Sequence, residues 1–333
     1  MSDKQLSLAI VGTGGIAKVH RNNLAAMGGT KIVAVADLSE ENRKEAAAAH
    51  GARAYADFNE MLDKEDGLDA LLLCTPPTVR KDVIALACER KLPVFSEKPP
   101  ARTDAEAAEI VDIIAKSGNI VSVGFMYRYL PAVDRIKQLI AGRPLNLVQG
   151  TFLCSPALTR AIPGWFYIKD KSGGHVVDQA IHVIDLIRFI AGDVTEVHTL
   201  GNNVICAKAE DFTIEDSSST NLRFASGASG SHVHSWAYDK FVAEVTLTSA
   251  DFRLTLALND RITGRVGDQA IDEKADGPEK GGIRSWEMGV FLDAVRTGDG
   301  SKIRSPYADA AKTLATVNAM NQSIDEAKPV PLG

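Results

Sequence analysis

Three ionisable residues take regular positions in the segment GGHVVDQAIHVID, which runs from Gly173 to Asp185. Asp178, His182 and Asp185 stand at i, i+4 and i+7, a spacing that places side chains on one face of a helix. The residues between them are mostly apolar, and ionisable groups on an apolar helix are costly unless they are paired or used. The segment therefore predicts a catalytic pair, a metal site or a buried polar network.

The metal interpretation has one further source of ligands. His232 and His234, in SHVHSW, share one face of a predicted strand and could chelate an ion. An H-x-H pair in a sheet is more often packed or solvated, so we expect no bound metal. The cysteines form no C-x-x-C pattern and indicate neither a zinc ribbon nor a disulfide framework; they are Cys74, Cys88, Cys154 and Cys206.

A glycine-rich turn near the N-terminus has the spacing of a dinucleotide cradle. LAIVGTGGIA places G-x-G-x-x-A between a predicted strand and a predicted helix. The first glycine allows a tight turn, the second lets the backbone approach a pyrophosphate, and the alanine permits close helix–strand packing. The helix N-terminus offers N–H donors and a positive dipole to the phosphates. We assign cofactor binding to Gly12, Gly14, Gly15, Ile16 and Ala17.

The next predicted strand, KIVAVAD, ends in an acidic residue. Asp37 lies 20 residues beyond Ala17, where a carboxylate accepts a hydrogen bond from a ribose 2′-hydroxyl. The same carboxylate would repel a 2′-phosphate, so NAD is favoured over NADP. Arg43 and Lys44 follow on a predicted helix, where they suit a solvated face better than a phosphate clamp, but they leave NADP open.

A lysine follows the fourth predicted strand, in LPVFSEKPP. Ligands of doubly wound sheets bind beyond the carboxyl ends of the strands. Proline disfavours helical geometry at the residue before it, so Lys98 is expected to be extended, with its ammonium available to a cofactor crevice. A solvated loop lysine is the alternative.

The elements that must position these residues change character along the chain. The first third alternates strands and helices, the pattern of β-α-β units and a parallel sheet. Strands are expected at 6–11, 32–36, 70–74, 93–96 and 120–123, and helices at 16–27, 40–50, 78–90 and 104–116.

After about residue 125 strands follow one another without intervening helices, which indicates an antiparallel sheet. A helix is expected after Pro131, and strands at 146–154, 194–207, 219–224, 230–235, 241–248 and 252–257. A charged, glycine-rich loop is expected at 268–282, followed by helices at 285–296 and 306–325.

Composition excludes several classes of protein. The 333 residues suggest two domains, and 45% hydrophobic with 24% charged residues is an ordinary globular balance. A net charge of −6 argues against a nucleic-acid surface. No apolar run is long enough to span a bilayer, and we expect the first residues not to act as a signal peptide. We expect a cytoplasmic protein with a small-molecule substrate and no nucleic-acid or membrane partner.

Five motifs occur in the order and spacing of one family. They are GTGGIA at 12–17, CTPP at 74–77, SEKPPA at 96–101, GFMYRYLP at 124–131 and the GGHVVDQAIHVID segment. The sequence resembles, along nearly its whole length, the glucose–fructose oxidoreductase, inositol dehydrogenase and MocA family of NAD(P)-dependent oxidoreductases. E-K-P combined with D-x-x-x-H is more specific than the glycine motif.

The resemblance implies a fold of the α/β class in two domains. A Rossmann domain is expected over residues 1–124, followed over 125–333 by an α+β domain with a large, mainly antiparallel open sheet. The C-terminal helix is expected to pack near the domain interface.

The resemblance also implies that Lys98, Asp178 and His182 meet at the nicotinamide. In oxidation of a secondary alcohol, His182 would take the hydroxyl proton and Asp178 would hold the imidazole. Lys98 would stabilise negative charge on the alcohol oxygen. Asp185 is expected to have a separate supporting role. Residues expected beside the cofactor are Thr75, Pro76, Glu97 and Lys98.

Substrate contacts are predicted from position alone. Tyr127 and Arg128 follow the last Rossmann strand, and Trp165 lies upstream of the catalytic helix, where its ring could stack on a sugar. Each also suits packing between domains. Departures from the family pattern leave the substrate open; they are Met126 for a polar residue, His175 for a glycine and Arg80 for a histidine.

The expected function is a dehydrogenase of a sugar, inositol or related polyol. An NAD-dependent glycosidase that uses transient oxidation and a non-catalytic dinucleotide-binding sensor are the alternatives. The far face of the second domain's sheet has no obvious covering helices, and such faces usually find partners. We therefore expect a homodimer or homotetramer formed through that sheet.

Overall fold

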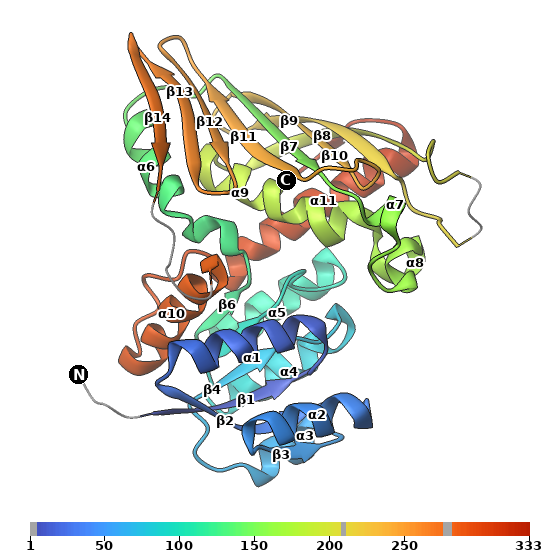
Figure 1. The fold of residues 1–333 in the computed structure, drawn as a ribbon, viewed down its shortest axis with the longest axis vertical. Coiled ribbons are helices and arrows are strands. Elements are labelled where there is room, and N and C mark those ends of the chain that lie inside the picture. Colours follow the sequence, from blue (N-terminus) through green and yellow to red (C-terminus); the bar gives the residue numbers. More distant parts are fainter. Residues whose placement is uncertain (1–4, 208–210, 276–281) are drawn as a thin grey trace. The chain divides into compact units, whose positions relative to one another are not determined.

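The computed structural model describes residues 5–207, 211–275 and 282–333 (Figure 1). These residues form two compact units: unit 1 contains residues 5–126 and 282–311, and unit 2 contains the remainder. The expected boundary at residue 124 lies close to this division. A second domain running unbroken to residue 333 does not describe the chain, because residues 282–311 belong to unit 1.

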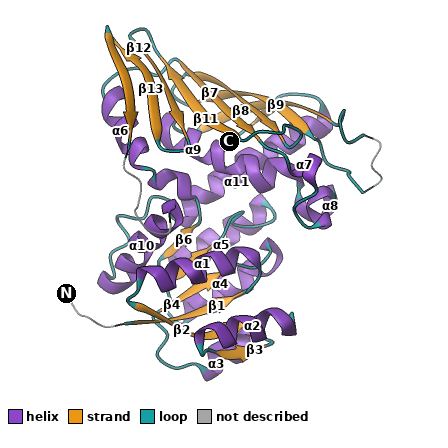
Figure 2. Cartoon of the chain, in the orientation of Figure 1, coloured by secondary structure: helices purple, strands orange, loops and turns teal. Residues whose placement is uncertain are grey.

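Unit 1 is built on a six-stranded parallel sheet in the order β3-β2-β1-β4-β5-β6 (Figure 2). Its strands are β1 (Leu6–Val11), β2 (Thr30–Ala36), β3 (Arg53–Tyr55), β4 (Ala70–Leu73), β5 (Val94–Ser96) and β6 (Val121–Val123). Its helices are α1 (Gly15–Met27), α2 (Glu40–His50), α3 (Phe58–Lys64), α4 (Arg80–Glu89), α5 (Asp104–Ser117) and α10 (Gly282–Thr297). This is the Rossmann arrangement that the alternating pattern predicts.

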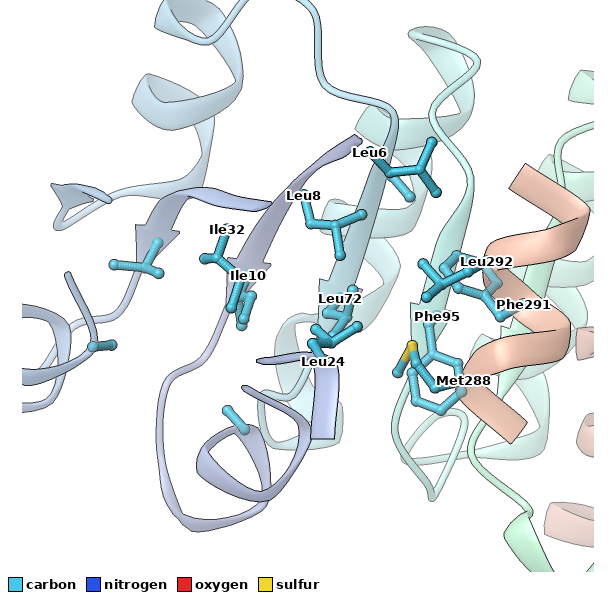
Figure 3. Packing of buried hydrophobic residues seen from close by; sticks show 14 residues of the cluster. Leu6, Leu8, Ile10, Leu24, Ile32, Leu72, Phe95, Met288, Phe291 and Leu292 are labelled. Carbon is cyan, nitrogen blue, oxygen red and sulfur yellow. The ribbon is translucent and has the colours of Figure 1, made fainter. Parts of the chain in front are cut away.

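The core of unit 1 explains why α10 returns to it. Leu8 and Ile10 of β1 are fully buried with Phe95 of β5. Met288 and Phe291 of α10 complete the same cluster (Figure 3). Burial of large side chains of this kind stabilises a fold by roughly 1.5–3 kcal/mol each. The apolar face of α10 therefore holds this late segment against the N-terminal sheet.

Local residues fix where the helices of unit 1 begin and end. The Thr103 hydroxyl accepts a hydrogen bond of 3.1 Å from the Glu106 N–H at the start of α5. Gly118 ends the same helix with φ +65°, a conformation that glycine adopts without steric cost. Capping of this type satisfies backbone groups that the helix itself leaves open.

Unit 2 contains a nine-stranded sheet in the order β14-β13-β12-β11-β7-β10-β9-β8-β15. Its strands are β7 (Leu147–Leu153), β8 (Val194–Asn202), β9 (Ser217–Phe224), β10 (Ser229–Ser235), β11 (Val242–Thr248), β12 (Phe252–Ala257), β13 (Arg261–Val266), β14 (Gln269–Lys274) and β15 (Val330–Pro331). Strands β7 and β10 are parallel and the other neighbours are antiparallel. The expected fold class, a Rossmann domain followed by a domain with a large, mainly antiparallel sheet, is confirmed.

Helices of unit 2 lie on one face of this sheet (Figure 2). They include α6 (Pro131–Ile140), α7 (Pro156–Thr159), α8 (Lys169–Ser172), α9 (Ile181–Ala191) and the part of α11 (Tyr307–Glu326) that follows Ala311. Gly150 of β7 allows α9 to approach closely, because a Cβ there would lie 2.7 Å from the Ile187 side chain and 3.1 Å from Val183. Among the described helices, none has the length and hydropathy to cross a bilayer.

The sequence interpretation missed several elements. Strand β14 lies within residues 268–282, where a loop is expected from the sequence. Residues 276–281 of that range lie outside the described residues. Both strands of the hairpin are largely exposed and carry charges such as the Arg261–Asp272 pair, 2.8 Å apart. An exposed strand lacks the apolar alternation that identifies a half-buried one. Strand β3 and helix α3 were missed as well.

Candidate functional site

The turn between β1 and α1 requires glycine at its first position. Gly12 has φ +83°, and a Cβ there would lie 2.8 Å from the backbone of Cys74 and Thr75 in the loop after β4. At Gly14 and Gly15, by contrast, a Cβ would meet no atom of the described chain within 4 Å. Gly12 is therefore packed against the loop after β4, whereas Gly14 and Gly15 are open. A phosphate can approach the backbone closely at such open glycines.

The N-terminus of α1 is chemically ready for an anion. Gly14 is its N-cap, and within the described chain no side chain caps it and no acidic residue lies in its first turn. Ala17 is fully buried against the sheet, so the helix begins close to β1. The first N–H groups of a helix have no partner within the helix and attract negative charge. These residues fit a dinucleotide pyrophosphate.

Asp37 is held in place by the glycine turn itself. Its Oδ2 accepts hydrogen bonds from the Thr13 N–H at 2.7 Å and the Thr13 hydroxyl at 2.9 Å. Its Oδ1 accepts from the Ser39 N–H at 2.8 Å. A carboxylate offers about four acceptor positions, so capacity remains for a ribose hydroxyl. Thr13, at the first variable position of the motif, is a site residue that the sequence interpretation missed.

The two cations after Asp37 have different environments. Lys44 pairs with Glu40 at 2.5 Å across one helical turn, as a solvated face predicts. Arg43 instead donates to the backbone carbonyls of Asp37 at 3.3 Å and Leu38 at 3.1 Å. Its guanidinium therefore lies at the turn between β2 and α2, beside the predicted ribose contact.

The loop after β5 carries Lys98 and is tied to α1 by its neighbour. Glu97 is buried and its Oε1 lies 2.6 Å from Nε2 of His20 on α1. The other oxygen, Oε2, accepts from the Lys98 N–H at 3.1 Å. Lys98 is half-buried, and the Lys98–Pro99 peptide is cis. Glu97 thus links the lysine loop to the helix that begins at the glycine turn.

Electrostatics keep Glu97 ionised. Burial raises the pKa of its carboxyl, but the hydrogen bond and charge of His20, with the charges of Lys98 and Arg80, outweigh burial and lower the pKa to about 2. His20 was missed from the sequence. A polar residue on the buried face of α1, in line with Ala17 and Leu24, was the available signal.

In unit 2, Asp178 and His182 stand where helix geometry changes. Asp178 belongs to a π-helical turn over Val176–Ala180, and His182 lies in the first turn of α9. Both are half-buried, whereas Asp185 is 1% exposed. The three residues were expected on one face. The π-helical turn breaks ideal α-helical spacing, and Asp185 points into the unit; such turns occur frequently at functional sites.

Aromatic and polar side chains surround this pair. The Tyr127 ring contacts the His182 imidazole edge to face, with centroids 5.7 Å apart. Gln179, next to Asp178, accepts hydrogen bonds from the indole N–H of Trp236 and from the Cys154 thiol, the latter at 3.3 Å. Gln179 and Cys154 were missed from the sequence: Gln179 is an unassigned position of D-x-x-x-H, and Cys154 lies outside the five motifs.

The surroundings of Cys154 raise the pKa of its thiol. Burial and then the negative charge of Asp178 raise the pKa of Cys154 to about 12. The Cys154 thiol, which donates to Gln179, therefore stays protonated at neutral pH. Gln179 thus lies where β7 and β10 end, beside Cys154 and Trp236, and the neighbouring helical turn carries His182 with its Tyr127 contact.

Arg128 and Asp185 form a buried pair apart from His182. The Arg128 guanidinium donates to both oxygens of Asp185, at 2.7 and 2.5 Å, and the Thr313 hydroxyl adds a bond of 2.8 Å. Burial raises the pKa of Asp185 against the charge of Arg128. Arg128 was considered a substrate contact; at 1% exposure its observed partner is Asp185.

Trp165, the remaining substrate candidate, lies on the surface of unit 2. It belongs to a 3₁₀ turn over Gly164–Tyr167 and is 42% exposed. Its ring stacks on Phe166 with centroids 3.7 Å apart. Phe166 therefore covers one face of the Trp165 ring, while part of that ring stays exposed to solvent.

His232 and His234 join His175 in a buried cluster. The His175 and His234 rings stack at 4.7 Å, and His234 also stacks on Phe152 at 5.3 Å. All three are almost fully buried, and their ring nitrogens have no hydrogen-bond partner among the described residues. Within the same residues no group of three or more His, Cys, Asp or Glu is arranged to hold a metal ion.

A glycine turn at a helix N-terminus, an acidic end to β2 and a parallel sheet define a dinucleotide-binding Rossmann domain. Comparison with known families agrees with this class. Residues 6–125 match the oxidoreductase family with an NAD-binding Rossmann fold, and residues 134–251 match the GFO/IDH/MocA C-terminal domain. The chain belongs to the GFO/IDH/MocA family of oxidoreductases.

Two curated relatives named as inositol dehydrogenases are similar to this chain. The chain is 32% identical over 232 residues to inositol 2-dehydrogenase 2 of Paenarthrobacter aurescens, covering 67% of this chain and 66% of the relative. It is 28% identical over 234 residues to the NAD⁺-dependent scyllo-inositol 2-dehydrogenase of Bacillus subtilis, covering 68% and 66%. The alignments thus span just under two thirds of the relatives' length.

A solved structure shares the fold over almost the whole chain. Levoglucosan dehydrogenase in complex with NADH and levoglucosan superposes with a TM-score of 0.85 and covers 98% of this chain and 99% of its own. Its sequence is 21% identical, a level at which the likeness shows the fold.

Proposed function

We propose that this protein is an NAD-dependent dehydrogenase that oxidises a secondary alcohol of a sugar, inositol or related polyol. The observation that carries the proposal is the half-buried Asp178–His182 pair at the π-helical turn, in a chain whose unit 1 is a Rossmann domain with an open phosphate cradle. Two curated relatives named as inositol dehydrogenases support the substrate class.

In unit 1 the cofactor would be held by the groups already described. The N–H donors at Gly14, Gly15 and Ile16 suit the pyrophosphate. Asp37 suits the adenosine ribose diol. We propose that Thr75 and Pro76, in the loop that contacts Gly12, flank the nicotinamide side together with the Glu97–Lys98 loop. When bound, NAD supplies the acceptor for a hydride.

In unit 2 the chain's own groups would manage the proton. His182 accepts the proton of the substrate hydroxyl, and the carboxylate of Asp178 favours the imidazolium that results. Tyr127 holds the imidazole plane by its edge-to-face contact. In this proposal Lys98, a residue of unit 1, stabilises negative charge on the alcohol oxygen as its proton leaves. With the proton taken by His182 and the hydride by NAD, the secondary alcohol would become a ketone.

Arg128 has a positioning role in this proposal, because its guanidinium is occupied by Asp185 inside unit 2. Trp165 remains the proposed surface for stacking on a sugar ring. The cysteines are free, consistent with a reducing cytoplasm, where we place the protein.

The test is a screen of NADH formation with inositols, aldoses and sugar derivatives at neutral pH, with NADP in parallel. The proposal predicts a substrate whose oxidation depends on His182. Release of a free sugar without net NADH would favour a glycosidase that oxidises transiently. Tight NADH binding with no turnover across the panel would favour a non-catalytic sensor.

A further inference from the structure

Arg80, the first residue of α4, has a polar environment that the proposed chemistry does not yet explain. Its side chain is 2% exposed. Its guanidinium donates to the Thr75 carbonyl through Nε at 3.2 Å and Nη2 at 2.6 Å. It also donates to the carbonyls of Glu97 and Pro99, and of Lys98 at 3.2 Å. One side chain therefore binds four carbonyls in two loops.

The lysine loop needs these donors. Pro99 and Pro100 have no N–H, so this segment cannot continue the hydrogen-bond ladder of β5. Its successive carbonyls are instead bound by side chains: those of residues 97–99 by Arg80, and that of Pro100 by the Tyr307 hydroxyl at 2.9 Å. A buried carbonyl without a donor costs roughly 1–3 kcal/mol, so Arg80 determines the path of the backbone here.

Charge also keeps Arg80 in this place. Burial lowers the pKa of Arg80 to about 10, with the charge of Glu97 opposing the shift. The guanidinium is thus still a cation at neutral pH. Only arginine offers five N–H donors in a planar fork; a histidine ring offers at most two.

We infer that Arg80 is a positioning residue that locks the Lys98 loop and the Thr75 loop into one arrangement. The inference rests on the proposed function, in which Lys98 acts on the substrate oxygen. Lys98 extends from a backbone whose carbonyl, with those of both its neighbours, is fixed by Arg80. Thr75, fixed by the same guanidinium, contacts the backbone of the glycine turn at Gly12. Loss of Arg80 should therefore disturb the orientation of Lys98 more than the affinity for dinucleotide.

The experiment compares Arg80→Met, Arg80→Lys and Arg90→Met with the wild-type enzyme. Arg90, the residue that follows the other end of α4, is more exposed and donates to the Leu62 carbonyl at 2.6 Å, so it controls for loss of an arginine that does not bind the lysine loop. Three quantities are measured: the Kd of NADH by fluorescence, turnover on the substrate from the screen, and the acetylation rate of Lys98 by acetic anhydride, followed by mass spectrometry.

In folded Arg80→Met, turnover at saturation should fall about 10²-fold, as displacement of a reacting group by about 1 Å does. The Kd of NADH should rise less than about fivefold, and the Lys98 acetylation rate should change by at least about threefold. Arg80→Lys keeps the charge but not the fork, and should lose about tenfold in turnover. Arg90→Met should match wild type in all three quantities.

Wild-type turnover and acetylation in folded Arg80→Met would overturn the inference, as would equal losses in Arg90→Met. If Arg80→Met does not fold, unchanged turnover and acetylation in Arg80→Lys overturn it. If the screen yields no substrate, the proposed function fails while NADH binding and Lys98 acetylation still decide whether Arg80 fixes the loop.

Discussion

Arg128 and Asp185 form a two-point ion pair inside unit 2, with nitrogen–oxygen distances of 2.7 and 2.5 Å and side chains at most 2% exposed. The pair joins the segment before α6 to the middle of α9, one turn beyond His182 on the same helix. The Thr313 hydroxyl binds Asp185 from α11 and is itself bound by Arg188 at 2.7 Å. The helix that carries the proposed base is therefore anchored by a buried charge network rather than by apolar packing alone.

The first prediction concerns this anchor. Arg128→Met leaves the Asp185 carboxylate buried without its cation and should lower the free energy of unfolding by about 3–5 kcal/mol. A second change, Asp185→Leu in the same chain, removes the orphaned charge and should recover part of the loss. Urea unfolding of both variants measures these differences. A loss below about 1 kcal/mol in Arg128→Met would show that the pair contributes little.

The second prediction concerns the cofactor. NAD should bind more tightly than NADP, because the Asp37 carboxylate, held by Thr13, would repel a 2′-phosphate at the proposed ribose position. Asp37→Ala should narrow the preference for NAD over NADP. Arg43, which stays beside the site, should then attract the 2′-phosphate of NADP. Fluorescence titration with both reduced cofactors measures this. NADP binding about tenfold tighter than NAD in the wild type would contradict it.

The third prediction concerns acid stability. Burial lowers the pKa of His232 to about 4 and that of His175 to about 3, and places that of His234 well below its usual range. Unfolded histidines titrate near 6.5, so the unfolded chain binds protons first as pH falls. The stability from keeping these rings neutral is complete above about pH 6.5 and is lost as pH falls toward their folded pKa values.

His234→Phe tests this point, because it keeps a ring between His175 and Phe152 but cannot take a proton. The free energy of unfolding is measured in urea at pH 7.5 and pH 5. The variant should lose roughly 1–2 kcal/mol less than wild type between these pH values. Equal losses would show that the cluster does not drive acid unfolding.

The fourth prediction concerns assembly. The face of the unit 2 sheet opposite its helices exposes apolar residues, including Val233 of β10 at 39% and Leu200 of β8 at 64%. Val233 alternates with the buried His232 and His234, so it points away from the helices. We predict a homodimer or homotetramer through this face, and dissociation in Val233→Asp. Sedimentation velocity at micromolar concentration measures the mass, and a wild-type monomer would contradict the prediction.

The sequence predicted the Rossmann half well, because its signals are local. Strand β1 and helix α2 have the expected bounds, and Asp37 lies against the glycine turn as its motif position indicates. These features depend on hydrophobic period, turn glycines and caps, which are written in consecutive residues. The family resemblance is confirmed for the same reason, since its motifs are short and ordered.

What the sequence did not predict depends on distant partners. The apolar face of α10 could cover either sheet, and the packing of residues such as Met288 and Phe291 with Leu8 assigns it to unit 1. The π-helical turn at Asp178 leaves no mark in the apolar pattern. Arg80 was noticed only as a departure from the family, since its role requires two loops to meet whose residues Thr75 and Lys98 are 23 positions apart.

The central claim is that His182 is the proton acceptor, and comparison of His182→Ala with Asp185→Asn tests it most directly. Turnover, NADH affinity and folding are measured for both on the substrate from the screen. His182→Ala should lower turnover about 10²–10⁴-fold with little change in NADH binding, and Asp185→Asn should cost much less. Near-normal turnover in folded, NADH-binding His182→Ala would contradict the account.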